Sequence, residues 1–229
     1  MFNSFKKILD DNWEISLKEN STELSKVIFH IEIIEELEKS INSEPQIMIR
    51  EVIYDIETAI VASLNSLYRN AYISMRSSVE LILAYIYFVD HNYDYLFWKN
   101  DKYDIKWSVL RDKEKGILNQ EYLSLFGNDN FELLIDSFIE VYHECSQSVH
   151  GKYEYMFSVR CGKIKYNKEA CLCYLKLNYK VTSLIIALLI IRYSDKILNI
   201  NEIYRTEIED ILKKYKLLGF TKKIKECWG

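Results

Sequence analysis

The stretch YHECSQSVHGKY (residues 142–153) holds two of the four histidines in the chain. Ser146 and His150 stand four residues apart and share a helix face, and Tyr142 and His143 lie on or next to that face. If the following glycine ends the helix, the histidine occupies its last turn, where unpaired carbonyl groups favour a protonated imidazole. Such a histidine can deliver a proton near neutral pH, although a histidine that merely caps the helix fits the same pattern.

A second candidate lies in RSSVELILAYIYF (residues 76–88). Arg76 and Glu80 are also four residues apart, and Glu80 interrupts an otherwise apolar run. A carboxylate buried without a partner is costly, so Arg76 is its natural partner. The pair suits either a functional site or a structural link between helices.

Both stretches lie in an expected all-α chain. One proline and six glycines in 229 residues favour long helices. We expect a single domain of long antiparallel helices over residues 1–229, with the core of the domain at about 47–195 and helical extensions at its N- and C-terminal ends. The expected helical segments are 2–12, 21–40, two helices within 47–90 that break near 69–70, 129–150, 167–195, 201–217 and 220–226. Short helices and turns are expected over 91–128, and a small β-hairpin over about 155–166.

Composition excludes several functional classes. The net charge of −4 gives no global attraction to nucleic acid or to a membrane, so RNA binding needs a local patch. Five cysteines without a CxxC pair argue against a disulfide framework and a zinc ribbon. No metalloprotease, phosphate-loop, dinucleotide or nucleophile-elbow motif is present, and we expect neither a metal nor a cofactor.

The most apolar segment, VTSLIIALLII (residues 181–191), is shorter than the roughly 20 residues that cross a bilayer. We therefore predict a buried core helix there. The opening MFNSFKKILDDNWEI turns acidic before an apolar signal region develops. We expect a soluble, cytoplasmic protein without a membrane partner.

The two motifs together, MRSSVEL in one helix and a later helix ending in SQSVHG, resemble the HEPN superfamily (higher eukaryotes and prokaryotes nucleotide-binding) over roughly residues 47–195. The likeness is to divergent bacterial members of abortive-infection or toxin type. The resemblance implies a helical bundle that forms homodimers. It also implies a metal-independent endoribonuclease that leaves 2′,3′-cyclic phosphate and 5′-hydroxyl ends. His150 matches the family histidine, which assists transfer of the ribose 2′-hydroxyl proton.

The family motif places an arginine five to seven positions ahead of this histidine, where the present chain has His143, Glu144 and Cys145. Arg76 is the candidate replacement from another helix, with Glu80 orienting it. Supporting roles are predicted for Tyr142, His143 and Ser146. The residues predicted to hold RNA are Lys152, Arg160, Lys163 and Lys165, with the lysine-rich C-terminal stretch as another patch.

Two functional hypotheses follow from the resemblance. The first is an endoribonuclease that acts on RNA as a toxin or anti-phage defence effector. The second is a non-catalytic helical module that binds a nucleotide or a protein partner, such as an antitoxin, in a defence or toxin–antitoxin system. The missing local arginine favours the second, and the polar residues within apolar helices favour the first.

Overall fold

A computed structural model describes residues 2–41, 43–150, 152, 164–197 and 200–228. The predicted all-α bundle is confirmed, and no strand occurs in these ranges. Most of the expected hairpin at 155–166 lies outside the described residues. The helices are α1 (Phe2–Ser40), α2 (Ile47–Leu64), α3 (Tyr68–Asp90), α4 (Asn92–Lys99), α5 (Trp107–Leu110), α6 (Gln120–Leu123), α7 (Glu132–Val149), α9 (Lys168–Tyr193), α10 (Glu202–Lys214) and α11 (Leu218–Trp228), with a 3-10 turn at Glu44–Gln46.

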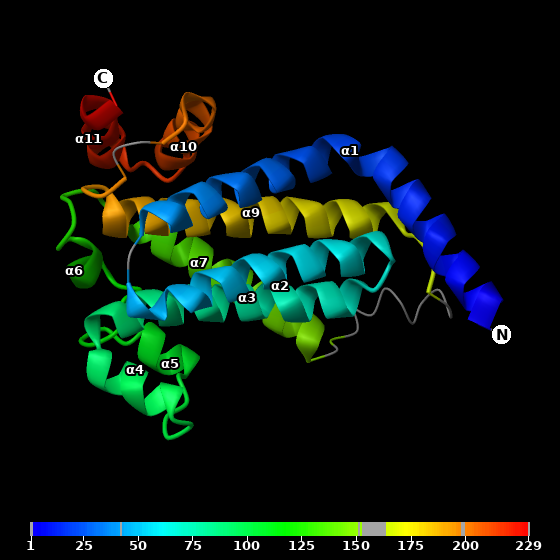
Figure 1. The fold of residues 1–229 in the computed structure, drawn as a ribbon, viewed down its shortest axis with the longest axis horizontal. Coiled ribbons are helices and arrows are strands. Elements are labelled where there is room, and N and C mark those ends of the chain that lie inside the picture. Colours follow the sequence, from blue (N-terminus) through cyan, green and yellow to red (C-terminus); the bar gives the residue numbers. More distant parts are fainter. Residues whose placement is uncertain (1, 42, 151, 153–163, 198–199, 229) are drawn as a thin grey trace.

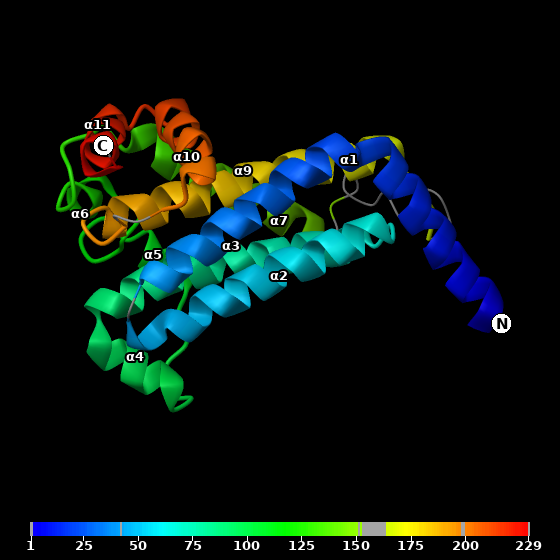
Figure 2. The same ribbon diagram turned by 45° about the horizontal axis from the view of Figure 1, so that its top comes forward.

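Helix α9 is the central element of the bundle (Figures 1 and 2). Every residue from Val181 to Ile191 is buried, so the predicted core helix is confirmed. Helices α1, α2, α3, α7 and α10 all contact it. Both α3 and α9 are long and apolar enough to cross a membrane by length and composition alone, but 61% and 83% of their most apolar windows are buried inside the protein. The cytoplasmic location stays a prediction.

Some neighbouring long helices run antiparallel to one another, and others run parallel. Hydrogen bonds pair Tyr68 with Asn167 near the start of α3 and α9, and Tyr85 with Tyr193 near their ends, so these two helices run in the same direction. Helix α1 also runs with α9, whereas α2 and α7 run the other way (Figure 1). The bundle therefore contains parallel neighbours beside the predicted antiparallel ones.

Helix α1 bends at Asn20, whose backbone is non-helical (φ −128°, ψ 21°). The buried side-chain amide of Asn20 donates to the carbonyl of Ser16 at 3.0 Å and to the hydroxyl of Tyr166 at 3.1 Å. Ser16 in turn donates to the carbonyl of Leu64 at 3.0 Å. The predicted start of a helix at residue 21 thus falls at this kink, and the half of α1 before it leaves the bundle (Figure 2).

The break between α2 and α3 lies at residues 65–67, a few residues before the predicted break at 69–70. Ser66 has a left-handed backbone (φ 63°), and the amide of Leu67 donates to the carbonyl of Ala62 at 2.8 Å. This is the Schellman geometry that usually places glycine at the position of Ser66. Because no glycine marks this turn in the sequence, the predicted break between α2 and α3 lies a few residues too late.

Helix α7 begins as predicted near Asn130, whose side chain accepts from the amide of Glu132 at 2.8 Å. The neighbouring Asp129 accepts from the amides of Gly219 and Phe220 at the start of α11. The apolar core of the described residues reaches from Leu24 in α1 to Ile224 in α11.

The burial of α9 gives a stability prediction. Leu184→Ala removes a fully buried side chain and should lower the free energy of unfolding by about 2–5 kcal/mol, because a cavity is left. Leu125→Ala, at a leucine that is 76% exposed, should change it by less than about 0.5 kcal/mol. Urea unfolding followed by circular dichroism compares the two, and similar losses would contradict a core centred on α9.

Candidate functional site

Arg76 and Glu80 of α3 meet Tyr142 of α7 in a closed triangle. The guanidinium Nη2 of Arg76 lies 3.1 Å from Glu80 Oε1 and 2.8 Å from the Tyr142 hydroxyl. That hydroxyl donates to the same Glu80 oxygen at 3.0 Å. Trp107 of α5 stacks on the Tyr142 ring, with centroids 3.6 Å apart and planes 5° apart. The predicted Arg76–Glu80 pair therefore exists, and it joins three helices.

The contacts within the triangle shift the pKa values of Arg76 and Tyr142. Burial lowers the pKa of Arg76, but Glu80 and Tyr142 outweigh this effect and hold that pKa above its usual value. Burial and the charge of Glu80 raise the pKa of Tyr142. At neutral pH Arg76 is thus a cation and Tyr142 a neutral donor. Within the described part of the chain, Arg76 Nε and Ser146 Oγ are buried without a hydrogen-bond partner.

His150 lies at the other end of the α3–α7 interface. It is exposed, it follows the last residue of α7, and its amide donates to the Ser146 carbonyl at 2.9 Å. It lies eight positions after Tyr142 in the sequence, which corresponds to about 12 Å along a helix axis. No contact among the described residues joins Arg76 to His150. A catalytic role for Arg76 beside His150 stays a prediction, and within one chain the register does not bring the two together.

Arg69, which the sequence analysis did not assign to a site, is the arginine at that end. Its Nη2 donates to the carbonyl of Val149, the residue before His150, at 2.8 Å. In antiparallel packing, the step of seven positions from Arg69 to Arg76 matches the step of seven positions from Tyr142 to Val149. Both arginines therefore face α7. The sequence alone does not distinguish Arg69 as a site residue, because its position beside α7 depends on how the two helices pair.

The remaining predicted residues are placed as follows. His143 is exposed and its Nε2 accepts from the amide of Gln147 at 2.7 Å. Lys152 and Lys165 are exposed. Arg160 and Lys163 lie outside the described residues. Within the ranges that the structure describes, no group of three or more His, Cys, Asp or Glu side chains is arranged to hold a metal ion.

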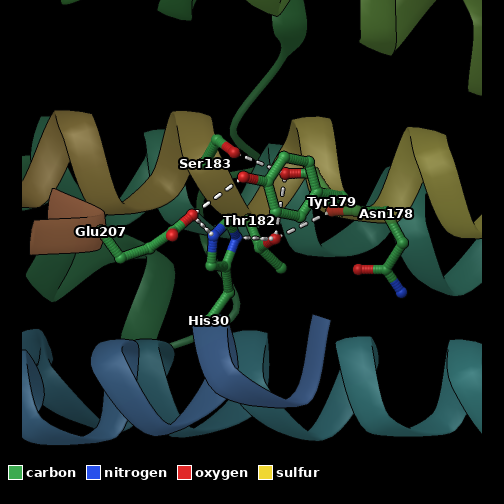
Figure 3. A network of polar contacts seen from close by, with 6 residues as sticks. All are labelled: His30, Asn178, Tyr179, Thr182, Ser183 and Glu207. Carbon is green, nitrogen blue, oxygen red and sulfur yellow. Dashed lines mark hydrogen bonds and ion pairs between the residues drawn. The ribbon is translucent and has the colours of Figure 1, made fainter. Parts of the chain in front are cut away.

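A second polar cluster surrounds His30, to which the sequence analysis gave no role (Figure 3). His30 of α1 is fully buried; its Nε2 lies 2.9 Å from Glu207 Oε1 of α10, and its Nδ1 lies 2.8 Å from Thr182 Oγ1 of α9. Tyr179 stacks on the imidazole at 4.4 Å and donates its hydroxyl to the same Glu207 oxygen at 2.8 Å. These partners are 152 and 177 residues from His30, beyond the reach of any local motif.

A third cluster joins the ends of α3 and α9. Arg192 donates to Asp90 Oδ1 at 2.6 Å, and the Tyr122 hydroxyl donates to Asp90 Oδ2 at 2.6 Å. A cavity of about 640 Å³ lies beside them, with Phe126 under the guanidinium at 4.7 Å. Because Asp90 is already paired with both donors, this cluster anchors the α6 segment to the bundle.

No family model, curated protein or solved structure matches the chain. Membership of the HEPN superfamily therefore stays a prediction that depends on the two short motifs.

The triangle gives the first prediction for this region. Tyr142→Phe keeps the stack on Trp107 but removes the hydroxyl that contacts Arg76 and Glu80. It should lower the free energy of unfolding by about 1–2 kcal/mol, measured in urea. The matched change Tyr93→Phe, at a tyrosine that is 70% exposed, should have almost no effect. Equal effects would mean that the triangle does not stabilise the fold.

The His30 cluster gives a prediction for pH. Burial lowers the pKa of His30 below 6.5, while the hydrogen bond to Glu207 and the charge of that carboxylate oppose the shift and Lys214 adds to it. At pH 6.5 the folded imidazole should therefore carry less protonated form than an unfolded histidine, which is half protonated there. Since the unfolded chain then binds more protons, His30 should make stability fall as the pH drops below about 6.5. NMR titration of the His30 ring checks this, and protonation at or above pH 6.5 would contradict it.

Proposed function

We propose that the chain is a metal-independent endoribonuclease that acts as a toxin or anti-phage defence effector. The observation that carries the proposal is the exposed His150 at the end of α7, with the Arg69 guanidinium on the carbonyl of the preceding residue. The cation of Arg69 therefore lies at the same end of α7 as the proposed proton-transfer group. This arrangement supplies from α3 the arginine that the local motif lacks.

The proposed reaction needs few groups. His150 takes the proton of a ribose 2′-hydroxyl, whose oxygen attacks the adjacent phosphorus and forms a 2′,3′-cyclic phosphate. Arg69 donates hydrogen bonds to the phosphate oxygens on which charge gathers. The departing 5′-oxygen takes a proton from a second acid, which a homodimer supplies as a second copy of His150. The exposed Lys152 and Lys165 attract the RNA backbone, as do Arg160 and Lys163 in the proposed patch.

The Arg76–Glu80–Tyr142 triangle has a positioning role in this proposal. It holds α7 against α3 two turns before His150 and so sets where the histidine lies relative to Arg69. A catalytic role for Arg76 across a dimer is the competing assignment, and the experiment below separates the two arginines.

A second candidate function is the non-catalytic helical module that binds a nucleotide or a protein partner, such as an antitoxin. The observation that favours it is that Arg76 Nη2 is bound by Glu80 and Tyr142, so that this arginine takes part in holding α3 to α7.

The test is cleavage of total cellular RNA by the purified protein in EDTA. His150→Ala should lower the rate by about 100-fold or more, because general acid–base catalysis contributes on that scale. Arg69→Ala should lower it by about 100-fold, and the products should carry cyclic phosphate ends. Arg111→Ala, at an exposed arginine elsewhere, is the matched control and should cleave like the unchanged protein.

Three outcomes would overturn parts of the proposal. No cleavage by the well-folded protein would leave the binding module as the better function. Equal cleavage by every variant would mean that a contaminating nuclease is responsible. Loss in Arg76→Ala with activity retained in Arg69→Ala would transfer the cationic role to Arg76, provided that both variants unfold at similar urea concentrations.

A further inference from the structure

A cavity of about 340 Å³ lies beside the His30 cluster. Its walls come from α1, α9 and α10, and they include Phe29, Leu175, Tyr179 and Glu207. The volume is at the lower end of the range found for small-molecule sites. Arg69 and His150 belong to α3 and to the end of α7, so this cavity is separate from the proposed ribonuclease site and does not depend on it.

Glu207 presents one carboxylate oxygen that the protein does not use. His30 and Tyr179 both donate to Oε1 (Figure 3), and no described residue pairs with Oε2. The side chain is 29% exposed. The hydrogen bond from His30 is the main reason why the pKa of Glu207 lies below its usual value. The carboxylate is therefore ionised at neutral pH, and two donors, the buried His30 and the half-buried Tyr179, fix its orientation.

Apolar and aromatic side chains form part of the lining beside Glu207. Leu175 is fully buried, and Phe29 and Tyr179 are half-buried. One face of the Tyr179 ring is covered by the imidazole of His30. A fixed carboxylate beside aromatic and aliphatic walls is the chemistry that recognises an organic cation with an apolar body.

We propose that this cavity binds a small organic ammonium compound, with its charged nitrogen on Glu207 Oε2 and its apolar body against Phe29 and Leu175. No covalent step is involved. The site is a binding site in which His30, Thr182 and Tyr179 act as positioning residues for the carboxylate.

The charged residues around the cavity limit the ligand to one positive charge. Lys26 and Lys176 also line the cavity and are exposed, so they repel a second cationic group. Glu23 lines the same cavity and offsets part of their charge. Lys214 points to the rings of Tyr179 and Tyr215, at 5.2 and 5.4 Å, and burial lowers its pKa. A monoamine with an apolar body fits this set better than a polyamine.

The test uses isothermal titration calorimetry of the full chain with 2-phenylethylamine and with its neutral analogue 2-phenylethanol. The amine should bind with one site per chain, and the alcohol at least about tenfold more weakly, because charge-assisted hydrogen bonds are the stronger ones. Glu207→Gln should weaken binding of the amine by about tenfold or more. Glu202→Gln, at an exposed glutamate at the start of the same helix, should leave it unchanged.

A further variant keeps the test decisive if Glu207→Gln fails to fold. Lys176→Glu changes an exposed residue that lines the cavity and should tighten amine binding at low salt. The proposal is overturned if the folded protein does not bind the amine at millimolar concentration. It is also overturned if amine and alcohol bind alike, or if Lys176→Glu binds the amine no more tightly than the unchanged chain.

Discussion

The apolar surface of α9 is the constraint on which the rest of the fold depends. From Val181 to Ile191 no side chain reaches solvent, so the helix has to be covered on every side. Helices α1, α2, α3, α7 and α10 provide this cover. Burial of this surface inside the protein also accounts for a helix whose composition alone resembles that of a membrane span.

Where the other helices pack around α9, polar side chains lie in the interfaces between helices. Each of them needs a hydrogen-bond partner there. The partners come from distant parts of the chain: Arg76 with Tyr142, Asp90 with Arg192, and His30 with Glu207. These contacts are directional, so they fix the register of helices that apolar packing alone holds less specifically. The register of α3 against α7 then decides that Arg69, and not Arg76, stands next to the end of α7.

The two candidate sites differ in how they are built. His150 and Arg69 lie at an exposed helix end, where a long polymer such as RNA has access. Glu207 lies beside a cavity of limited size and is held by a buried imidazole, as suits a small ligand. Both use polar contacts between helices, and the contact of His30 with Thr182 reaches the buried segment of α9 itself.

Local patterns were sufficient to predict the all-α class, the buried helix at 181–191 and the extent of α7. They also predicted the pairing of Arg76 with Glu80. Apolar periodicity and contacts one helical turn apart are properties of neighbouring residues, so a short segment contains them. Local patterns were insufficient for the end of α2 at Ser66, where serine takes a backbone conformation that glycine usually marks. Nor did they identify Arg69 beside Val149, or His30 with Thr182 and Glu207. Those contacts join residues 80 to 177 positions apart. They exist only because many apolar side chains on several helices together set how the helices pack, and no short segment contains that information.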